Sequence, residues 1–267
     1  MESLSSVPAP GGKRIAVRVK PAAERALRRG HPWLFDDSIR RLSHDGAPGD
    51  LAVIFDARDR FLAIGLYDPD SPIRVRILHQ GEPATIDSGW YADRLRRAFA
   101  RRASLDNAKT TGYRLVHGEN DGLPGLVLDR YGNSGVVRLD TAAWLPHLNS
   151  VLTEALALEP LERLVLRLSR RVKSNQDRLH GLHDGQLLKG KPSSRPIIFY
   201  ENGLRFEVNL IRGQKTGFFL DQRENRAKVE QLIGQDRSLQ RVLNTFSYTG
   251  GFSVYAARAG AIHLTNV

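Results

Sequence analysis

The sequence predicts a multidomain protein of mixed α/β and α+β class. Short alternating apolar strands fill its first third, helix and strand patterns alternate in its middle, and a strand–helix–strand unit ends it. We expect four parts: a disordered tail at 1–12, a β-barrel at 13–85, a central α+β domain at 86–196, and the start of a parallel sheet at 197–267.

The barrel is predicted from the period-two alternation of apolar residues. A short helix at 22–29 ends at Gly30, and Pro32 favours extended backbone in the residue before it. The expected strands are residues 14–19, 31–35, 51–56, 61–67 and 73–78. Five short strands separated by turns predict a compact barrel. We interpret His31-Pro32-Trp33 as aromatic packing at a barrel corner, in preference to a base-stacking or catalytic site.

The central unit begins with a helix that Asp87 or Ser88 caps and that runs to about Leu105. A second helix is expected at 146–158, and a polar, glycine-rich mobile loop at 174–194. The expected strands are residues 113–116, 126–129, 135–139 and 161–168. His117, Glu119 and Asp121 lie among glycines and a proline, so we interpret them as turn residues and expect no metal site.

The last unit contains a strand, a glycine turn, a helix and a second strand. The expected strands are residues 197–200, 204–209, 217–220, 241–246 and 261–267, and the expected helices are 223–233 and 252–259. Such a crossover is typical of parallel, doubly wound sheets. One crossover cannot cover both faces of a parallel sheet, so we expect that further sequence belongs after Val267.

The charge balance favours a polyanionic partner. The 267 residues include 40 Lys and Arg against 29 Asp and Glu, a formal net charge of +11, and such a charge strengthens binding to nucleic acids through phosphate contacts. A basic but otherwise ordinary surface is the alternative. The helix after Asp87 has an almost wholly cationic polar face, whereas a solvated helix mixes charges of both signs. The residues expected to bind RNA are Arg94, Arg96, Arg97, Arg101, Arg102, Arg170, Arg171 and Lys173.

Other classes are excluded by composition. The chain has no cysteine, which rules out disulfides, thiolate–zinc sites and a cysteine nucleophile within it. No stretch approaches the ~18 apolar residues of a transmembrane helix. The first twelve residues lack the order of a signal peptide. We therefore expect a cytoplasmic protein without a membrane partner.

The strongest local motif is the buried strand that runs into Gly250-Gly251 and then into a helix. Glycines permit close approach of a ligand, and a helix N-terminus offers free N–H groups. The third glycine of a dinucleotide-binding loop is missing, and the nearby Phe246 and Tyr248 suit an adenosine with a carboxylate better than a pyrophosphate. We therefore expect a ligand cavity beside this bend; a purely structural glycine turn is the alternative.

A second motif, residues 213–226, combines apolar anchors with a dense polar set. Asp221 is interpreted as a helix N-cap, with Glu224 completing a capping box. That role leaves Lys215, Gln222, Arg223 and Asn225 unexplained.

The segments QKTGFFLDQRENR and VLNTFSYTGGFSVYAARAGA resemble the PUA-domain-containing family of ribosomal RNA large-subunit methyltransferases, which includes the cytosine-5 methyltransferase of 23S RNA. RALRRGHPWLFDDSI, GDLAVIFD, FLAIGLYDPDSPIRVRIL and YRLVHGENDGLPGLVLDRYGN are similar to that family's PUA and central domains. The resemblance spans roughly residue 14 to the last residue. It implies a PUA-like barrel and a class I, Rossmann-like methyltransferase sheet whose glycine loop binds S-adenosylmethionine.

Carried over by motif, the resemblance implies a set of cofactor contacts, namely Phe246, Ser247, Tyr248, Thr249, Gly250, Gly251, Gln222 and Arg223. Residues that line the same pocket or approach the substrate would be Lys215, Thr216, Asp221 and Asn225. The family's acidic ribose-binding residue, its Asp-Pro-Pro motif and its catalytic cysteine have no counterpart here. Since pyrimidine C5 methylation needs a thiolate adduct, no catalytic residue is expected in this chain, and the chain by itself is expected to be inactive.

The resulting expectation is an S-adenosylmethionine-dependent methyltransferase of RNA, with 23S ribosomal RNA and a cytosine-5 reaction implied by the resemblance. The alternative is a non-catalytic RNA-binding protein that retains a vestigial methyltransferase scaffold. A nucleotide-dependent oxidoreductase is disfavoured by the missing third glycine. The modified nucleotide and the oligomeric state, a homodimer included, are left open.

Overall fold

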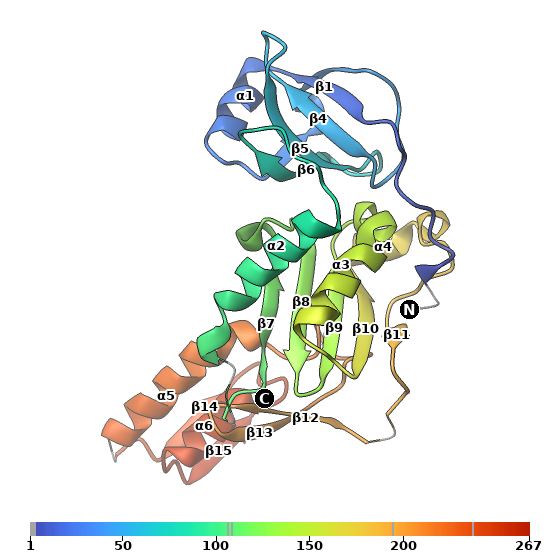
Figure 1. The fold of residues 1–267 in the computed structure, drawn as a ribbon. Coiled ribbons are helices and arrows are strands. Elements are labelled where there is room, and N and C mark those ends of the chain that lie inside the picture. Colours follow the sequence, from blue (N-terminus) through green and yellow to red (C-terminus); the bar gives the residue numbers. More distant parts are fainter. Residues whose placement is uncertain (1–3, 106, 108, 194, 237) are drawn as a thin grey trace.

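The computed structural model describes residues 4–105, 107, 109–193, 195–236 and 238–267, which form three units along the chain (Figure 1). The first unit is a curled sheet of six strands in the order β2-β6-β5-β4-β1-β3, with one α-helix. Its elements are β1 (Ile15–Val19), α1 (Pro21–Arg28), β2 (Trp33–Phe35), β3 (Ile39–Leu42), β4 (Leu51–Phe55), β5 (Phe61–Tyr67) and β6 (Ile73–Gln80).

The five expected strands of this unit are present, and β3 is a sixth. Its sequence, Ile39-Arg-Arg-Leu42, places two exposed arginines side by side and so breaks the alternation that marks the other strands. Antiparallel pairing with β1 holds β3 at the sheet edge. The tail was expected to be disordered, and residues 1–3 lie outside the described part. Leu4 is nevertheless buried in the central core, and the Ser6 hydroxyl donates to the carbonyl of His180.

The central unit is a five-stranded sheet in the order β11-β10-β9-β8-β7, with α2 and α3 packed together against it (Figure 1). Its elements are α2 (Ser88–Ala100), β7 (Gly112–His117), β8 (Leu126–Tyr131), β9 (Ser134–Leu139), α3 (Leu145–Leu158), β10 (Arg163–Leu168), α4 (Arg170–Ser174) and β11 (Leu187–Lys189). Asp87 caps α2 by accepting from the N–H of Trp90, as expected.

The segment 174–194, expected to be a loop, contains β11 and its pairing with β10. Asp184 further anchors this segment, because its carboxylate accepts from the N–H of Leu168 at 2.7 Å and pairs with Arg167 at 3.1 Å. The strand β11 was not predicted because it has only three residues and lies in a segment of polar composition.

The first two units share buried polar contacts. Thr141, just ahead of α3, donates to the carboxylate of Asp68 at 2.6 Å, and both residues are buried. The ring of His147 hydrogen-bonds the carbonyl of Gly49 at 2.7 Å. Buried polar pairs of this kind fix one domain against the other, because neither group has water to replace its partner.

The last unit contains β12 (Ile197–Glu201), β13 (Leu204–Val208), α5 (Arg223–Gln235), β14 (Arg241–Asn244), α6 (Gly251–Arg258) and β15 (His263–Asn266). β12 and β13 form an antiparallel hairpin, and β14 pairs with β15 in parallel, as the crossover predicts. The strand expected at 217–220 is wrong: Gly217 has φ 128°, and a 3₁₀ turn at Leu220–Gln222 follows.

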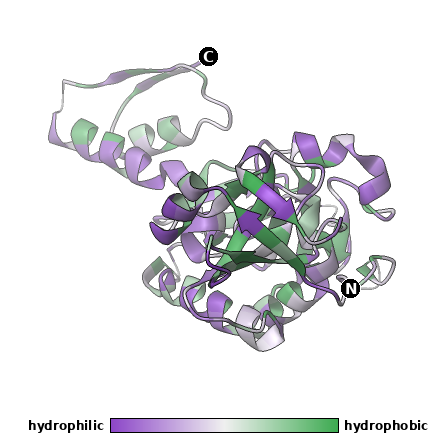
Figure 2. Cartoon of the chain, turned by 90° about the horizontal axis from the view of Figure 1, so that it is seen from above, coloured by the Kyte–Doolittle hydropathy of each residue, from purple (hydrophilic) through white to green (hydrophobic). Residues whose placement is uncertain are grey.

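Seen from above, α5, α6, β14 and β15 form a body at one side of the chain (Figure 2). Every helix in the described part of the chain is too short or too polar to cross a bilayer.

Candidate functional site

A cavity of about 740 Å³ lies beside the Gly250 bend, between the loop before α5 and the loop after β14. It is lined by Gln214, Lys215, Phe218, Phe219, Asp221, Gln222, Arg226, Phe246, Ser247, Tyr248, Thr249, Phe252 and Val267. The two motifs that the sequence singled out therefore meet at one cavity. A second cavity, of about 610 Å³ and mostly apolar, lies beside Tyr248 and Thr249 and is bounded by β10, β11 and β13.

Backbone geometry favours glycine at position 250, and close packing favours it at position 251. Gly250 has φ 69°, in the left-handed region where other residues are strained. A Cβ on Gly251 would lie 3.2 Å from Cδ of Arg226, so a larger residue would press on that side chain. Gly251 begins α6, whose first N–H groups have no intrahelical partner and carry the positive end of the helix dipole.

Three non-glycine residues of the cavity wall also have left-handed backbone. These are Lys215 at φ 53°, Phe246 at φ 58° and Tyr248 at φ 49°. Such conformations cost about 1–3 kcal/mol each and persist where the surroundings enforce them, often at functional sites. Phe246 as a whole residue is 96% exposed, so no packing inside the described chain explains its position.

The hydroxyl of Tyr248 ties the two loops together. It accepts from the N–H of Gln214 at 3.0 Å and donates to the carbonyl of Gly217 at 3.2 Å. The ring of Tyr248 meets that of Phe219 edge-on, with centroids 5.3 Å apart. The cavity therefore has a cross-linked aromatic wall.

Lys215 is one of two cationic residues that line the cavity, and the other is Arg226. The Nζ of Lys215 lies 3.1 Å from the carboxylate of Asp221 and 4.4 Å from the centre of the Phe219 ring. Partial burial alone would raise the pKa of Asp221, but the hydrogen bond and charge of Lys215 outweigh it and hold that pKa below its ordinary value. Asp221 is thus a carboxylate at neutral pH.

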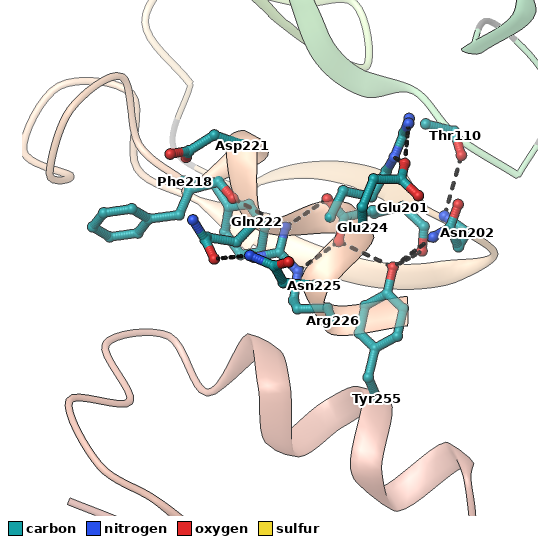
Figure 3. Close-up of polar contacts among 12 residues, drawn as sticks. Thr110, Glu201, Asn202, Phe218, Asp221, Gln222, Glu224, Asn225, Arg226 and Tyr255 are labelled. Carbon is teal, nitrogen blue, oxygen red and sulfur yellow. Dashed lines mark hydrogen bonds and ion pairs between the residues drawn. The ribbon is translucent and has the colours of Figure 1, made fainter. Parts of the chain in front are cut away.

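The capping box expected for Asp221 and Glu224 is wrong. Gln222 is the N-cap of α5 and makes no side-chain cap, because the 3₁₀ turn before the helix directs Asp221 to Lys215. Glu224 pairs with the adjacent Arg223, and Asn225 donates to the side-chain oxygen of Gln222 at 2.8 Å (Figure 3).

Arg226, which lines the cavity, belongs to a buried ion pair (Figure 3). Arg226 of α5 makes two hydrogen bonds, of 2.8 and 2.7 Å, to the carboxylate of Glu201 at the end of β12. Tyr255 of α6 donates to the same carboxylate at 3.0 Å. Burial, followed by the charge of Glu201, raises the pKa of Tyr255, so this group stays a neutral donor.

Not every residue expected at this site lines the cavity. Thr216 is 1% exposed and points to the central unit, where its hydroxyl donates to Asp129. Arg223 lines a smaller cavity of about 250 Å³ that borders β7, and Asp221 lines both cavities. Asn225 lines neither cavity and contacts the site through its hydrogen bond to Gln222.

Sequence reasoning did not find four residues that support the site, namely Arg114, Asp129, Glu201 and Arg226. Each lies in an ordinary strand or helix pattern, and the two pairs join residues 15 and 25 positions apart, which no local motif links. One signal was available: Asp129 stands among apolar neighbours of a buried strand, where a carboxylate needs a partner.

The arginines expected to bind RNA fall into two groups. Directly after α2, Arg101 and Arg102 both pair with the buried Asp121, and on α2 Arg96 pairs with Asp93. Arg94 lies over the Trp90 ring, 4.9 Å from its centre.

Among the residues that the structure describes, no acidic side chain stabilises the charge of Arg94. Burial, followed by repulsion from Arg97 and Arg101, lowers its pKa. The middle and C-terminal part of α2 therefore presents an uncompensated positive charge.

The second group, on α4, is partly used to hold the domains together. Arg171 donates to the carbonyl of Asp70 at 2.7 Å, and Lys173 pairs with Asp184 at 3.2 Å. Arg170 is exposed.

The aromatic run after α1 packs as the sequence analysis favoured. His31 and Trp33 meet edge-on at 5.9 Å, and the indole N–H of Trp33 donates to Glu119 at 2.9 Å. Glu119 and Asp121 are thus occupied by neighbours. Within the described residues, no group of three His, Cys, Asp or Glu side chains could hold a metal ion.

The sequence matches two family models. Residues 17–80 match a PUA-like domain, and residues 167–267 match an S-adenosylmethionine-dependent methyltransferase. A ribosomal RNA large subunit methyltransferase of Deinococcus radiodurans is 51% identical over 98% of this chain. Ribosomal RNA large subunit methyltransferase I of Pseudoalteromonas translucida is 37% identical over 94% of it.

Solved structures agree on the fold. A structure described as a SAM-dependent methyltransferase from Streptococcus mutans superposes over 94% of the chain with a TM-score of 0.77 at 23% identity. A second, described as a methyltransferase complexed with SAH, covers 95% with a TM-score of 0.78, also at 23% identity.

The chain spans 64% of the length of the Deinococcus relative and 62% of the Pseudoalteromonas relative. Both the PUA-like unit and the methyltransferase sequence expected from the motifs are present, in the expected order. The chain thus combines a segment that matches a PUA-like domain with one that matches an S-adenosylmethionine-dependent methyltransferase, and it is similar to ribosomal RNA large subunit methyltransferases.

Proposed function

We propose that this chain binds S-adenosylmethionine in the cavity beside Gly250 and takes part in methylating large-subunit ribosomal RNA in the cytoplasm. The proposed target, from the resemblance, is carbon 5 of a cytosine in 23S RNA. The observation that carries the proposal is the cavity of about 740 Å³ where the two family motifs meet.

The residues of the cavity fit this cofactor. Phe219, Phe246 and Tyr248 offer flat apolar surfaces for an adenine ring. The N–H groups at the start of α6 suit a carboxylate, and Asp221 suits an ammonium group. When bound, S-adenosylmethionine would supply an electrophilic methyl group on its sulfonium.

The RNA is proposed to lie along the cationic face of α2. Arg94 and Arg97 have no acidic partner among the described residues, and their charges repel one another. Phosphate groups would relieve this repulsion, which gives the face its affinity for RNA. The expected RNA-binding roles of Arg101 and Arg102 are weaker, because Asp121 already neutralises part of their charge.

The chemical step needs a group that this chain lacks. Pyrimidine C5 is made nucleophilic by addition of a thiolate, and none of the 267 residues is a cysteine. The proposed share of this chain is therefore to hold the methyl donor and the RNA.

The absence of cysteine from the 267 residues also favours a rival function, that of a non-catalytic RNA-binding protein with a vestigial methyltransferase scaffold. Calorimetric titration with S-adenosylhomocysteine and with NAD separates the two. We expect saturable binding of the first and none of the second. RNA binding without S-adenosylhomocysteine binding would favour the rival, and binding of NAD would contradict both.

A further inference from the structure

The loop of residues 214–219, which forms one wall of the cavity, is held from behind by the central sheet. Asp129 of β8 is fully buried, and its carboxylate accepts from the Thr216 hydroxyl at 2.5 Å. Arg114 of β7 fixes the same carboxylate with two hydrogen bonds, of 2.8 and 3.1 Å. A buried carboxylate is stable only when paired in this way.

Tyr131 also hydrogen-bonds the loop of residues 214–219. It lies two residues after Asp129 on β8, so both side chains leave the same face of the sheet. The hydroxyl of Tyr131 lies 3.1 Å from that of Thr216 and 3.3 Å from the N–H of Phe218. Burial raises the pKa of Tyr131, which keeps the hydroxyl protonated.

The direction of each hydrogen bond follows from counting protons. Thr216 has one hydroxyl proton and gives it to Asp129, so it accepts the proton of Tyr131. Tyr131 in turn accepts from the N–H of Phe218. In this series, the N–H of Phe218 and the hydroxyls of Tyr131 and Thr216 each donate their proton to the next group, and the Asp129 carboxylate accepts the last one.

This chain of hydrogen bonds surrounds the strained part of the loop. Gly217, between Thr216 and Phe218, has φ 128°, and a Cβ there would lie 2.3 Å from the Val208 side chain. Lys215 precedes Thr216 in a left-handed conformation. Strained backbone persists only where neighbours over-determine it, and here the neighbours are the side chains of β8.

We propose that Thr216 and Tyr131 are positioning residues of the donor cavity, which hold Lys215 and Phe218 in place through Asp129. Neither Thr216 nor Tyr131 lines the cavity, whereas Lys215 and Phe218 do. The central domain thereby sets the shape of the cofactor site. This inference rests on the proposed function, because it takes the cavity to be the methyl-donor site.

Tyr131→Phe tests the inference with the smallest change, since it removes one hydroxyl and keeps the ring. We expect the dissociation constant of S-adenosylhomocysteine, measured calorimetrically on the whole chain, to rise about tenfold, the factor that matches the net contribution of one hydrogen bond. Thr216→Val is expected to weaken binding similarly, and Thr216→Ser to restore it.

Tyr113→Phe is the matched control. Tyr113 is also a buried tyrosine of the central sheet, but its hydroxyl accepts from Arg130, away from the loop. We expect this variant to lower the melting temperature without changing the dissociation constant. Amide hydrogen exchange gives a readout that needs no ligand: Tyr131→Phe should speed exchange at Phe218, and Tyr113→Phe should not.

The two possible failures are distinguishable. If the wild-type chain does not bind S-adenosylhomocysteine, the proposed function is wrong and the inference fails with it. If the wild type binds, and Tyr131→Phe and Thr216→Val bind equally well, only the inference is overturned. Should Thr216→Val not fold, the Tyr131→Phe and Thr216→Ser pair still decides the question.

Discussion

Arg226 and Glu201 form a two-pronged ion pair whose side chains are 3% and 0% exposed. The pair joins α5 to the end of β12, and Tyr255 brings α6 to the same carboxylate. The two helices that contribute to the cavity wall, α5 and α6, are therefore tied to β12 by one carboxylate. Removal of one partner from a buried ion pair leaves the other charge unpaired, and this costs more than the pair contributes.

Glu201→Gln is therefore expected to lower the free energy of unfolding by about 3 kcal/mol or more. Glutamine has nearly the same shape as glutamate, so the decrease in the free energy of unfolding measures the cost of leaving the Arg226 guanidinium without a negative partner. Urea unfolding followed by circular dichroism measures it. Glu230→Gln is the control, because the Arg258–Glu230 pair is about one third exposed and should change stability by about 1 kcal/mol or less. Equal losses would show that burial of the Glu201 pair has no special effect.

Gly250→Ala should weaken the binding of S-adenosylhomocysteine by about tenfold, because a left-handed conformation costs a non-glycine residue about 1–2 kcal/mol and the bend would relax away from the cavity. Calorimetric titration of the folded variant measures the change. Gly234→Ala in α5 is the control: a Cβ there meets nothing within 4 Å. That substitution should stabilise the helix by up to about 1 kcal/mol and leave ligand affinity unchanged. Unchanged affinity in Gly250→Ala would contradict the role of the bend.

The parts of the fold that could be predicted are those that depend on local sequence patterns, such as apolar runs between turns. β5 was expected at residues 61–67 and occupies Phe61–Tyr67, because its apolar residues run between clear turns. The strand at 217–220 was predicted wrongly from the same kind of apolar run. Its backbone is instead set by Asp129 and Tyr131, which lie almost ninety residues earlier in the chain. A local sequence pattern contains no information about hydrogen bonds to residues that distant.

The residues of the candidate site could likewise be predicted where they belong to a local motif, and not where their role depends on packing. Tyr248 and Asp221 stand in dense motifs, and both line the cavity. Arg226 and Glu201 were missed, since an arginine on a helix and a glutamate at a strand end usually face solvent. Thr216 was expected in the pocket by its neighbours in sequence, but the turn at Gly217 directs its side chain to the central sheet. Which side of a strained loop a residue faces depends on packing that no motif records.

Asp56 should make stability depend on pH in the acidic range. Hydrogen bonds from the backbone N–H of Arg60, then of Arg58, outweigh the opposing effect of burial and lower its pKa from 3.8 to about 2. A carboxylate with a lowered folded-state pKa stabilises the protein above its unfolded-state pKa, and this contribution disappears as pH falls through the folded-state value. The stability difference between wild type and Asp56→Asn should therefore be constant above about pH 5 and shrink between pH 4 and 2. Urea unfolding across this range measures it; a difference that does not vary with pH would contradict the assignment.

Arg97→Gln should weaken RNA binding in a salt-dependent way. Arg97 is exposed on α2, beside Arg94, where an RNA phosphate is the partner that would offset the crowded charge. Each lost contact to single-stranded RNA should reduce the slope of log affinity against log salt by about 0.7. Fluorescence anisotropy with a labelled RNA, titrated at several salt concentrations, gives this slope.

Arg205→Gln removes the same charge from an exposed strand of the β12–β13 hairpin and is the matched control. A protein whose net charge of +11 attracts RNA without a defined face would lose the same slope in both variants, because each loses one positive charge. If RNA binds a defined face on α2, only Arg97→Gln should reduce the slope of log affinity against log salt. Equal slopes in both variants would assign the affinity to net charge and remove α2 as the binding face.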